Sequence, residues 1–192
     1  MADHAAGGDV AQIGALLADE LPYLWHDAYL ELTLRLTNIL RVTDNDFTYI
    51  FDWYSALEER GEVAPDAATE DRLVGACGFS RHAPTKRDAS RQRGWVGPTE
   101  KHFGRDCDKG HFIPYALGGG LEINLFMQLR AVNRGWSHAG GLYRSMECYC
   151  QQHLGTFFFN RPFYADGTSR PAMLEFGIVK TDGQLWVERF EN

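Results

Sequence analysis

The sequence contains no apolar run that approaches the roughly 20 residues a membrane-spanning helix needs. Its first residues, MADH, also lack the basic and apolar regions of a cleaved signal peptide. We therefore expect no membrane contact, and a protein that is cytoplasmic or exported by a route without a cleavable signal peptide. The oligomeric state stays open.

Cysteine is scarce as well. The four cysteines, Cys77, Cys107, Cys148 and Cys150, are too few and too unevenly spaced for a disulfide-stapled secreted domain. On a helix, Cys148 and Cys150 would point to different faces, and their spacing is not that of the zinc-binding pair C-x2-C. The pattern favours buried free thiols over a structural zinc site.

Basic residues are the minority overall, since 19 Lys and Arg stand against 26 Asp and Glu, a net charge of −7. The imbalance is confined to one part of the chain. Residues 1–79 hold 4 basic and 15 acidic side chains, whereas residues 80–111 hold 8 and 4. The acidic total argues against a nucleic-acid partner, but the basic stretch 80–111 is suited to an anion. The ordinary interpretation of such a run is a solvated surface.

The length suits one ordinary domain, or one domain with an appendage. Residues 1–79 predict an acidic, mainly helical segment: an amphipathic helix at 8–20 and a Leu-rich helix at 25–41. Residues 47–61 start with aromatic and β-branched side chains and end as a helix at a glycine. Residues 62–72 predict a loop.

Residues 80–192 predict the second domain. Residues 80–107 look irregular, a strand should approach His111, and residues 141–154 predict a helix that stops at Gly155. Three antiparallel strands should follow, joined at two Asp-Gly pairs. They are expected at 156–164, 173–180 and 185–190. The run of three Phe at 157–159 favours a strand core over a platform for stacking bases.

Three side chains offer the chemistry of phosphodiester hydrolysis, which needs a base for water and a cation beside the phosphate. The imidazole of His111 suits the base near pH 7. The amide oxygen of Asn133 and the carboxylate of Glu147 are ligands that Mg²⁺ prefers. Each also has a plainer interpretation, because a strand-end His is often a packed residue, Asn-x-Gly is often a turn, and Glu147 suits a solvated helix face.

Five segments in order carry a resemblance to a known family. They are DKGHFI at 108–113, GG at 118–119, NLFMQ at 124–128, VNRG at 132–135 and YRSME at 143–147. In this order they resemble the DNA/RNA non-specific endonucleases, which are ββα-metal nucleases related to endonuclease G, and above all the bacterial toxin-type branch. That branch shares a later pattern, here Tyr164, Gly167, Ser169, Arg170 and Pro171. The resemblance covers residues from about 100 to 192.

The resemblance implies an α+β fold, with a ββα-metal nuclease core and a C-terminal antiparallel sheet in residues 80–192. It implies that His111 is the general base, that Asn133 binds the divalent metal and that Glu147 holds a metal-bound water. The implied cofactor is Mg²⁺, with Mn²⁺ as an alternative. Asn124 would orient the histidine or its loop, and Asp108 would pin the local backbone.

The chain departs from the family in two places. Lys109 stands where the family has Arg, which keeps the charge but loses the bidentate fork for phosphate. Residues 136–141 lengthen the link between Asn133 and the helix of Glu147. Beside Lys109, the side chains expected to contact phosphate or nucleic acid are Arg134, Arg144, Arg105, Lys101 and Arg93.

The predicted function is therefore a metal-dependent endonuclease that cuts DNA, RNA or both with little sequence preference. The toxin-type branch implies a bacterial toxin or effector with an immunity or inhibitor protein as partner, in which residues 1–79 serve delivery, partner binding or self-masking. Two other classes stay open. One is a catalytically impaired protein of this fold that binds a partner through its acidic face. The other is a hydrolase of small phosphoesters.

Overall fold

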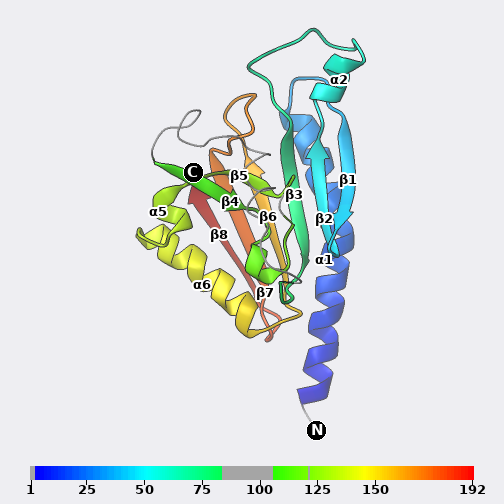
Figure 1. Ribbon diagram of the computed structural model, residues 1–192. Helices are drawn as coiled ribbons and strands as arrows, with labels where there is room; N and C mark the ends of the chain where they lie inside the picture. The colour runs from blue at the N-terminus through cyan, green and yellow to red at the C-terminus, as the bar shows by residue number, and fades with distance from the viewer. Residues whose placement is uncertain (1–2, 84–105, 121) are drawn as a thin grey trace.

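The structure is a computed structural model that describes residues 3–83, 106–120 and 122–192, with side chains from Asp9 onward. An antiparallel six-stranded sheet in the order β1-β2-β3-β6-β7-β8 runs through it, with helices on both faces (Figure 1). Its strands are β1 (Ile39–Asp44), β2 (Phe47–Asp52), β3 (Arg72–Phe79), β6 (Phe157–Phe163), β7 (Met173–Val179) and β8 (Leu185–Glu191).

The other elements stand on the two faces of this sheet or at its end. The first part of the chain adds the helices α1 (Asp3–Leu32) and α2 (Ser55–Glu59). The middle part forms a separate two-stranded ribbon, β4 (Cys107–His111) with β5 (Leu125–Leu129). Around the ribbon lie the 3-10 turn η1 (Tyr115–Leu117), the short helix α5 (Arg130–Asn133) and the helix α6 (His138–Gln152).

Strand β6 shows how the sheet separates two cores. Side chains alternate between the faces of a strand. Phe157 and Phe159 therefore join the core under α1, with Trp25 and Val74, while Phe158 joins the core under the ribbon and α6. All three Phe side chains are buried, which confirms that the run at 157–159 is a strand core.

Helix α1 lies along one face of the sheet because its apolar residues recur at helical spacing. The stripe that meets the sheet is Val10, Ile13, Leu17, Leu21, Trp25 and Tyr29. Trp25 packs where β3 has Gly75, since a Cβ on that glycine would come within 2.4 Å of the indole ring. The two expected helices at 8–20 and 25–41 are in fact one helix that ends at Leu32, with Pro22 inside it.

The expectation for residues 1–79 needs correction. The helix predicted to reach residue 41 ends earlier, and residues 39–44 form strand β1. This segment contributes β1, β2 and β3, and β3 pairs with β6. Residues 1–79 therefore complete the main sheet and do not stand apart as a mainly helical unit. Strand β1 was missed because the leucines of residues 25–41 mix helical and alternating spacing.

Other expectations are confirmed. The three C-terminal strands lie where the alternation placed them, and the helix expected at 141–154 is α6. Asp182-Gly183 forms the expected tight turn, whereas Asp166-Gly167 lies within the longer loop 164–172. Residues 47–61 form a strand and then a short helix that ends before Gly61, whose φ is +71°. Of the helices within the described ranges, none combines the length and apolar composition needed to cross a membrane.

Replacing Gly75 with Ala should weaken the docking of α1, because the added methyl group displaces the buried Trp25 ring. We expect a loss of about 1–3 kcal/mol in the free energy of unfolding, measured by urea denaturation. Gly141→Ala is the matched control, since nothing lies within 4 Å of its added Cβ on helix α6. The control should be neutral or slightly stabilising. Equal stability of the two variants would contradict the packing described.

Candidate active site

His111 is the last residue of β4 and pairs with Leu125 of β5. Lys109 lies two residues earlier, so the two side chains leave the same face of the ribbon. Gly110 faces the other way, and a Cβ there would meet Gln128 Oε1 at 2.4 Å. The glycine of the DKGH segment is thus required by close packing across the ribbon.

Asn124 fixes the loop that follows His111. Its Oδ1 accepts a hydrogen bond from Ile113 N at 2.7 Å, and its Nδ2 donates to the carbonyls of Ile113 and Gly120 at 2.7 and 2.8 Å. Its own carbonyl accepts from Phe112 N at 3.0 Å. Gly119 is needed beside it, since a Cβ there would lie 2.0 Å from Ile113 O. A buried asparagine therefore holds the strand end that carries His111.

A second asparagine fixes the same strand end from the main sheet. Asn160 on β6 is fully buried, and its Nδ2 donates to Phe112 O at 2.6 Å. The Phe112 ring in turn stacks on Phe126 of β5 with ring centres 4.2 Å apart. The backbone next to His111 is thus anchored both to its own ribbon and to the central sheet.

Asp108 organises two arginines beside the ribbon. Its Oδ1 accepts from Arg130 Nε at 3.0 Å, and its Oδ2 accepts from Arg134 Nε at 2.6 Å. The Arg134 guanidinium also lies over the Trp136 ring, 5.1 Å from its centre. Although burial opposes it, bonding to Arg134 and Arg130 lowers the pKa of Asp108. Asp108 thereby ties α5 to β4.

Asn133, the last residue of α5, binds the backbone of the same strand. Its Nδ2 donates to Lys109 O at 3.3 Å, two residues before His111. A carbonyl can only accept, so this bond identifies the amide nitrogen and leaves Oδ1 as an acceptor. Within the described part of the chain, no hydrogen bond uses that oxygen. Asn133 therefore carries a half-exposed oxygen next to the strand of His111.

Glu147 lies on the side of α6 that faces the core. It is one helical turn from the buried residues Tyr143 and Cys150, and its charge raises the pKa of both. Burial in turn raises the pKa of Glu147 to about 7, and the nearby Arg144 only partly opposes this. Residues 138–141, within the lengthened link, form the first turn of α6. Glu147 is therefore a partly buried carboxylate and not a solvated one.

Three buried polar residues to which the sequence analysis gave no role lie close together: Tyr143 on α6, Gln128 on β5 and Asn160 on β6. Within the described residues, buried atoms without a hydrogen-bond partner include Tyr143 Oη, Gln128 Nε2 and Asn160 Oδ1. The amides of Asn160 and Gln128 lie close enough to the Tyr143 hydroxyl to lower its pKa, although burial dominates and raises it. Buried polar atoms without a hydrogen-bond partner are rare in apolar cores, because each lowers the free energy of unfolding by about 1–3 kcal/mol. The sequence does carry a signal for two of these residues, because Asn160 and Gln128 are the polar residues of the otherwise apolar segments FFFN and LFMQL.

The remaining predicted residues are placed as follows. Lys109 is half-buried, and this burial lowers its pKa. Arg144 is exposed on α6, and its side chain passes Gly135. The fork of Arg134 is occupied by Asp108, so its predicted contact with phosphate would require a change of partner. Arg105, Lys101 and Arg93 lie outside the described residues, as does most of the basic stretch.

Two of the predicted residues carry oxygen donors of the kind a hard divalent cation prefers. Asn133 offers an amide oxygen, and Glu147 offers a carboxylate whose pKa burial raises although Arg144 lies nearby. Oxygen donors of this kind are typical of Mg²⁺ and Mn²⁺. In the described ranges, no three His, Cys, Asp or Glu side chains gather as a metal-binding group. The candidate site would therefore rely on few protein ligands, as Mg²⁺ sites commonly do.

Comparison with known proteins finds no matching family model and no matching curated protein. Among solved structures, the chain is similar to one described as the structure of Sda1 nuclease with bound zinc ion. The two are 13% identical, with a TM-score of 0.37 over 81% of this chain and 74% of that one. A similarity of this size establishes neither a shared fold nor a shared activity.

Replacing Asn124 with Ala should destabilise the protein, because it leaves the Ile113 N–H and two carbonyls without their partners inside the loop. We expect a loss of about 3 kcal/mol in the free energy of unfolding by urea denaturation. Ser145→Ala is the control, since it removes one exposed hydrogen bond to Gly141 O. Equal stability of the two variants would refute the structural role of Asn124.

Glu147 should make stability depend on pH in the metal-free protein. Its pKa is about 7 when folded, against an ordinary 4.5, so the folded state keeps the proton longer than the unfolded chain. Stability contributed by the protonated form is lost as pH rises through this interval. Glu147→Gln should remove that decline and be more stable at pH 8 by on the order of 2 kcal/mol. The free energy of unfolding is measured against pH by urea denaturation in EDTA. If it changes with pH in the same way in the variant and the wild type, the predicted contribution of Glu147 is wrong.

Proposed function

We propose that this protein is a metal-dependent endonuclease that hydrolyses phosphodiester bonds of DNA, RNA or both, with His111 as the general base. The observation that carries the proposal is the placement of Asn133. The short helix α5 binds the β4 backbone through it, two residues before His111, and leaves its amide oxygen free of other bonds among the described residues. A potential metal ligand and a potential base thus belong to one rigid unit.

The rigidity of that unit supports the proposal. Asn124 and Asn160 hold the residues directly after His111, and Asp108 holds α5 against β4. Groups that perform general base catalysis must be kept within hydrogen-bond reach of the proton they remove. A strand end fixed from three sides meets that requirement better than a free loop would.

The cation, when bound, would neutralise the charge that builds up on the phosphate. Asn133 would hold it directly, and Glu147 would hold one of its waters. His111 would take the proton from the attacking water at an imidazole nitrogen. We favour Mg²⁺ because both protein donors are oxygens, whereas zinc sites use nitrogen and sulfur more often.

Contact with the phosphate backbone alone would give little sequence preference. Lys109, on the same ribbon face as His111, is the described cation best placed to accompany the base. Arg134 and Arg144 stand at the edge of the same region, on α5's end and on α6. These three cations support binding to a polyanion despite the negative total charge.

The test is cleavage of plasmid DNA and of RNA in Mg²⁺ by wild type, His111→Ala and Asn133→Ala. Removing the base should lower the rate by about 10²–10⁴-fold, and EDTA should abolish cutting. Asn133→Ala should lose activity in a way that higher Mg²⁺ partly restores, because it weakens metal binding.

His26→Ala is the control, since this partly exposed histidine lies on α1, on the other face of the sheet. It should cut at the wild-type rate. Cutting that persists in EDTA, or full activity of His111→Ala in a correctly folded sample, would refute the proposal. Absence of cutting by the wild type on both polymers would favour the partner-binding alternative instead.

A further inference from the structure

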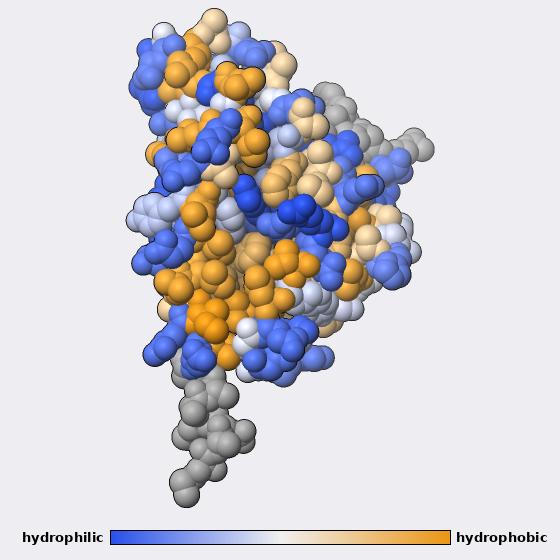
Figure 2. Space-filling view, turned by 180° about the vertical axis from the view of Figure 1, so that it is seen from behind, coloured by the Kyte–Doolittle hydropathy of each residue, from blue (hydrophilic) through white to orange (hydrophobic). Residues whose placement is uncertain are grey.

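A pocket lies on the α1 face of the main sheet, away from His111. It has a volume of about 440 Å³ and is formed by the end of α1, the chain to Arg35, strand β3, the end of β6 and the loop 164–167. Figure 2 shows the molecule from behind, where a strongly hydrophilic patch adjoins apolar surface. Three arginines line the pocket: Arg35, Arg72 and Arg161.

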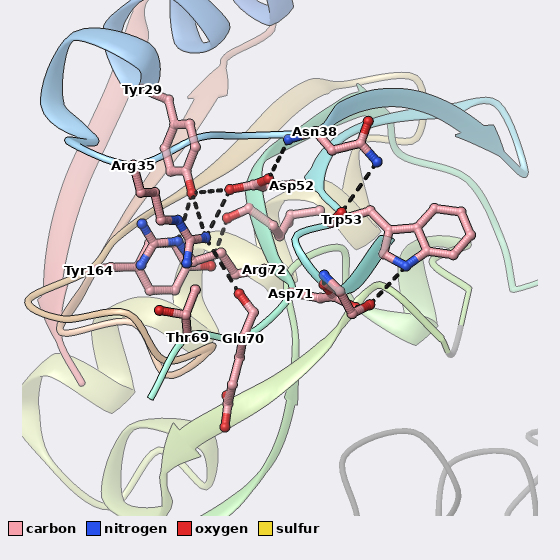
Figure 3. Close-up of polar contacts among 12 residues, drawn as sticks. Tyr29, Arg35, Asn38, Asp52, Trp53, Thr69, Glu70, Asp71, Arg72 and Tyr164 are labelled. Carbon is pink, nitrogen blue, oxygen red and sulfur yellow. Dashed lines mark hydrogen bonds and ion pairs between the residues drawn. The ribbon is translucent and has the colours of Figure 1, made fainter. Parts of the chain in front are cut away.

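The floor of this pocket is a buried charge network (Figure 3). Asp52 is fully buried and accepts hydrogen bonds from Tyr29 Oη at 2.7 Å and from Arg35 Nη2 at 2.8 Å. Arg72 donates through Nε to Tyr29 Oη at 2.7 Å and through Nη1 to the carbonyl of Asp166 at 2.6 Å. Arg35 therefore binds the buried carboxylate directly, whereas Arg72 reaches it only through the Tyr29 hydroxyl.

The arginines keep unused hydrogen-bonding capacity. Within the described residues, Arg35 Nε and Nη1 are buried without a partner, and no hydrogen bond uses Arg72 Nη2. Arg161 has no hydrogen bond there either and lies over the Phe163 ring, 4.9 Å from its centre. Burial lowers the pKa of Arg161, while nearby Glu175 raises it and Arg189 lowers it.

The nearby carboxylates leave these arginine donors unused. Asp52 is bound to Arg35 and Tyr29. Asp166 Oδ1 accepts bonds from Thr168 N and Oγ1, although its charge still interacts with Arg72. Glu175 pairs with Arg189 at 2.9 Å. Buried guanidinium N–H groups without an acceptor are unfavourable, so the pocket is predisposed to bind an anion that supplies acceptor oxygens.

Aromatic rings complete the pocket. Arg72 is held between the rings of Tyr29 and Tyr164, 5.2 and 4.4 Å from their centres, and so keeps a fixed orientation. Trp25 and Phe163 add apolar surface to the lining. Such walls suit a flat ring next to an anionic group, because rings stack and forks of arginine bind phosphate or carboxylate.

We propose that this pocket binds a small anion that carries a flat ring, with its phosphate or carboxylate between Arg72 and Arg161. A mononucleotide and an aromatic carboxylate share this chemistry. The site is separate from the candidate active site, since Arg161 and Asn160 are neighbours on β6 and alternate between its two faces. The proposal stands whether or not the protein cuts nucleic acids.

The test is calorimetric titration of the full chain in EDTA with two pairs of probes. Adenosine monophosphate is compared with adenosine, and benzoate with benzamide. The charged member of at least one pair should bind at least about 10-fold more tightly than its neutral partner. The pair that responds identifies the source of the anion. Neutral probes that bind as well as the anions, or no binding by either anion, would overturn the proposal.

Variants locate the binding. Arg161→Gln should lower the affinity for the anion that binds by at least about 10-fold without changing the melting temperature. Arg161→Lys should have an intermediate affinity, because it keeps the charge but loses the guanidinium fork. Arg60→Gln is the matched control, an exposed arginine paired with Glu62 outside the pocket. Unchanged affinity in a folded Arg161→Gln protein would assign the binding elsewhere and refute this site.

Discussion

The alternation of side chains along β6 is the constraint on which the rest of the structure depends. Phe157, Phe159 and Arg161 face α1, whereas Phe158 and Asn160 face the ribbon. A slip of one residue would move each of them to the opposite face. The three consecutive Phe would still supply rings to both faces, but the backbone after His111 would lose the Asn160 anchor and the pocket would lose Arg161.

Two asparagines and one aspartate turn this packing into a defined site. Asn124 and Asn160 satisfy backbone groups around Phe112 and Ile113 that would otherwise be buried without partners. Asp108 pairs with both Arg130 and Arg134 and joins α5 to the ribbon. None of these three residues needs to react in order to matter, since together they determine where His111 and Asn133 lie.

Much of the fold could be read from sequence where the signal is local. The Asp182-Gly183 turn, the helical spacing of α6 and the strand approaching His111 all depend on residues close together in the chain. The N-terminal strands could not be read in this way. β1 is an edge strand with mostly exposed and half-buried residues, so its pattern is weak, and its pairing with β2 and that of β3 with β6 are decided by distant contacts.

The sequence by itself determined the chemistry within reach: a histidine at a strand end, an amide and a carboxylate downstream, and a chain whose basic residues cluster before that histidine. Only the tertiary structure decided that Glu147 is partly buried, that Asp108 occupies the fork of Arg134 and that Tyr143, Gln128 and Asn160 form a polar cluster. It also decided that Arg35, Arg72 and Arg161 meet around one pocket. The reason is physical: residue type and spacing specify local structure, whereas burial and charge partners depend on residues far apart in the chain.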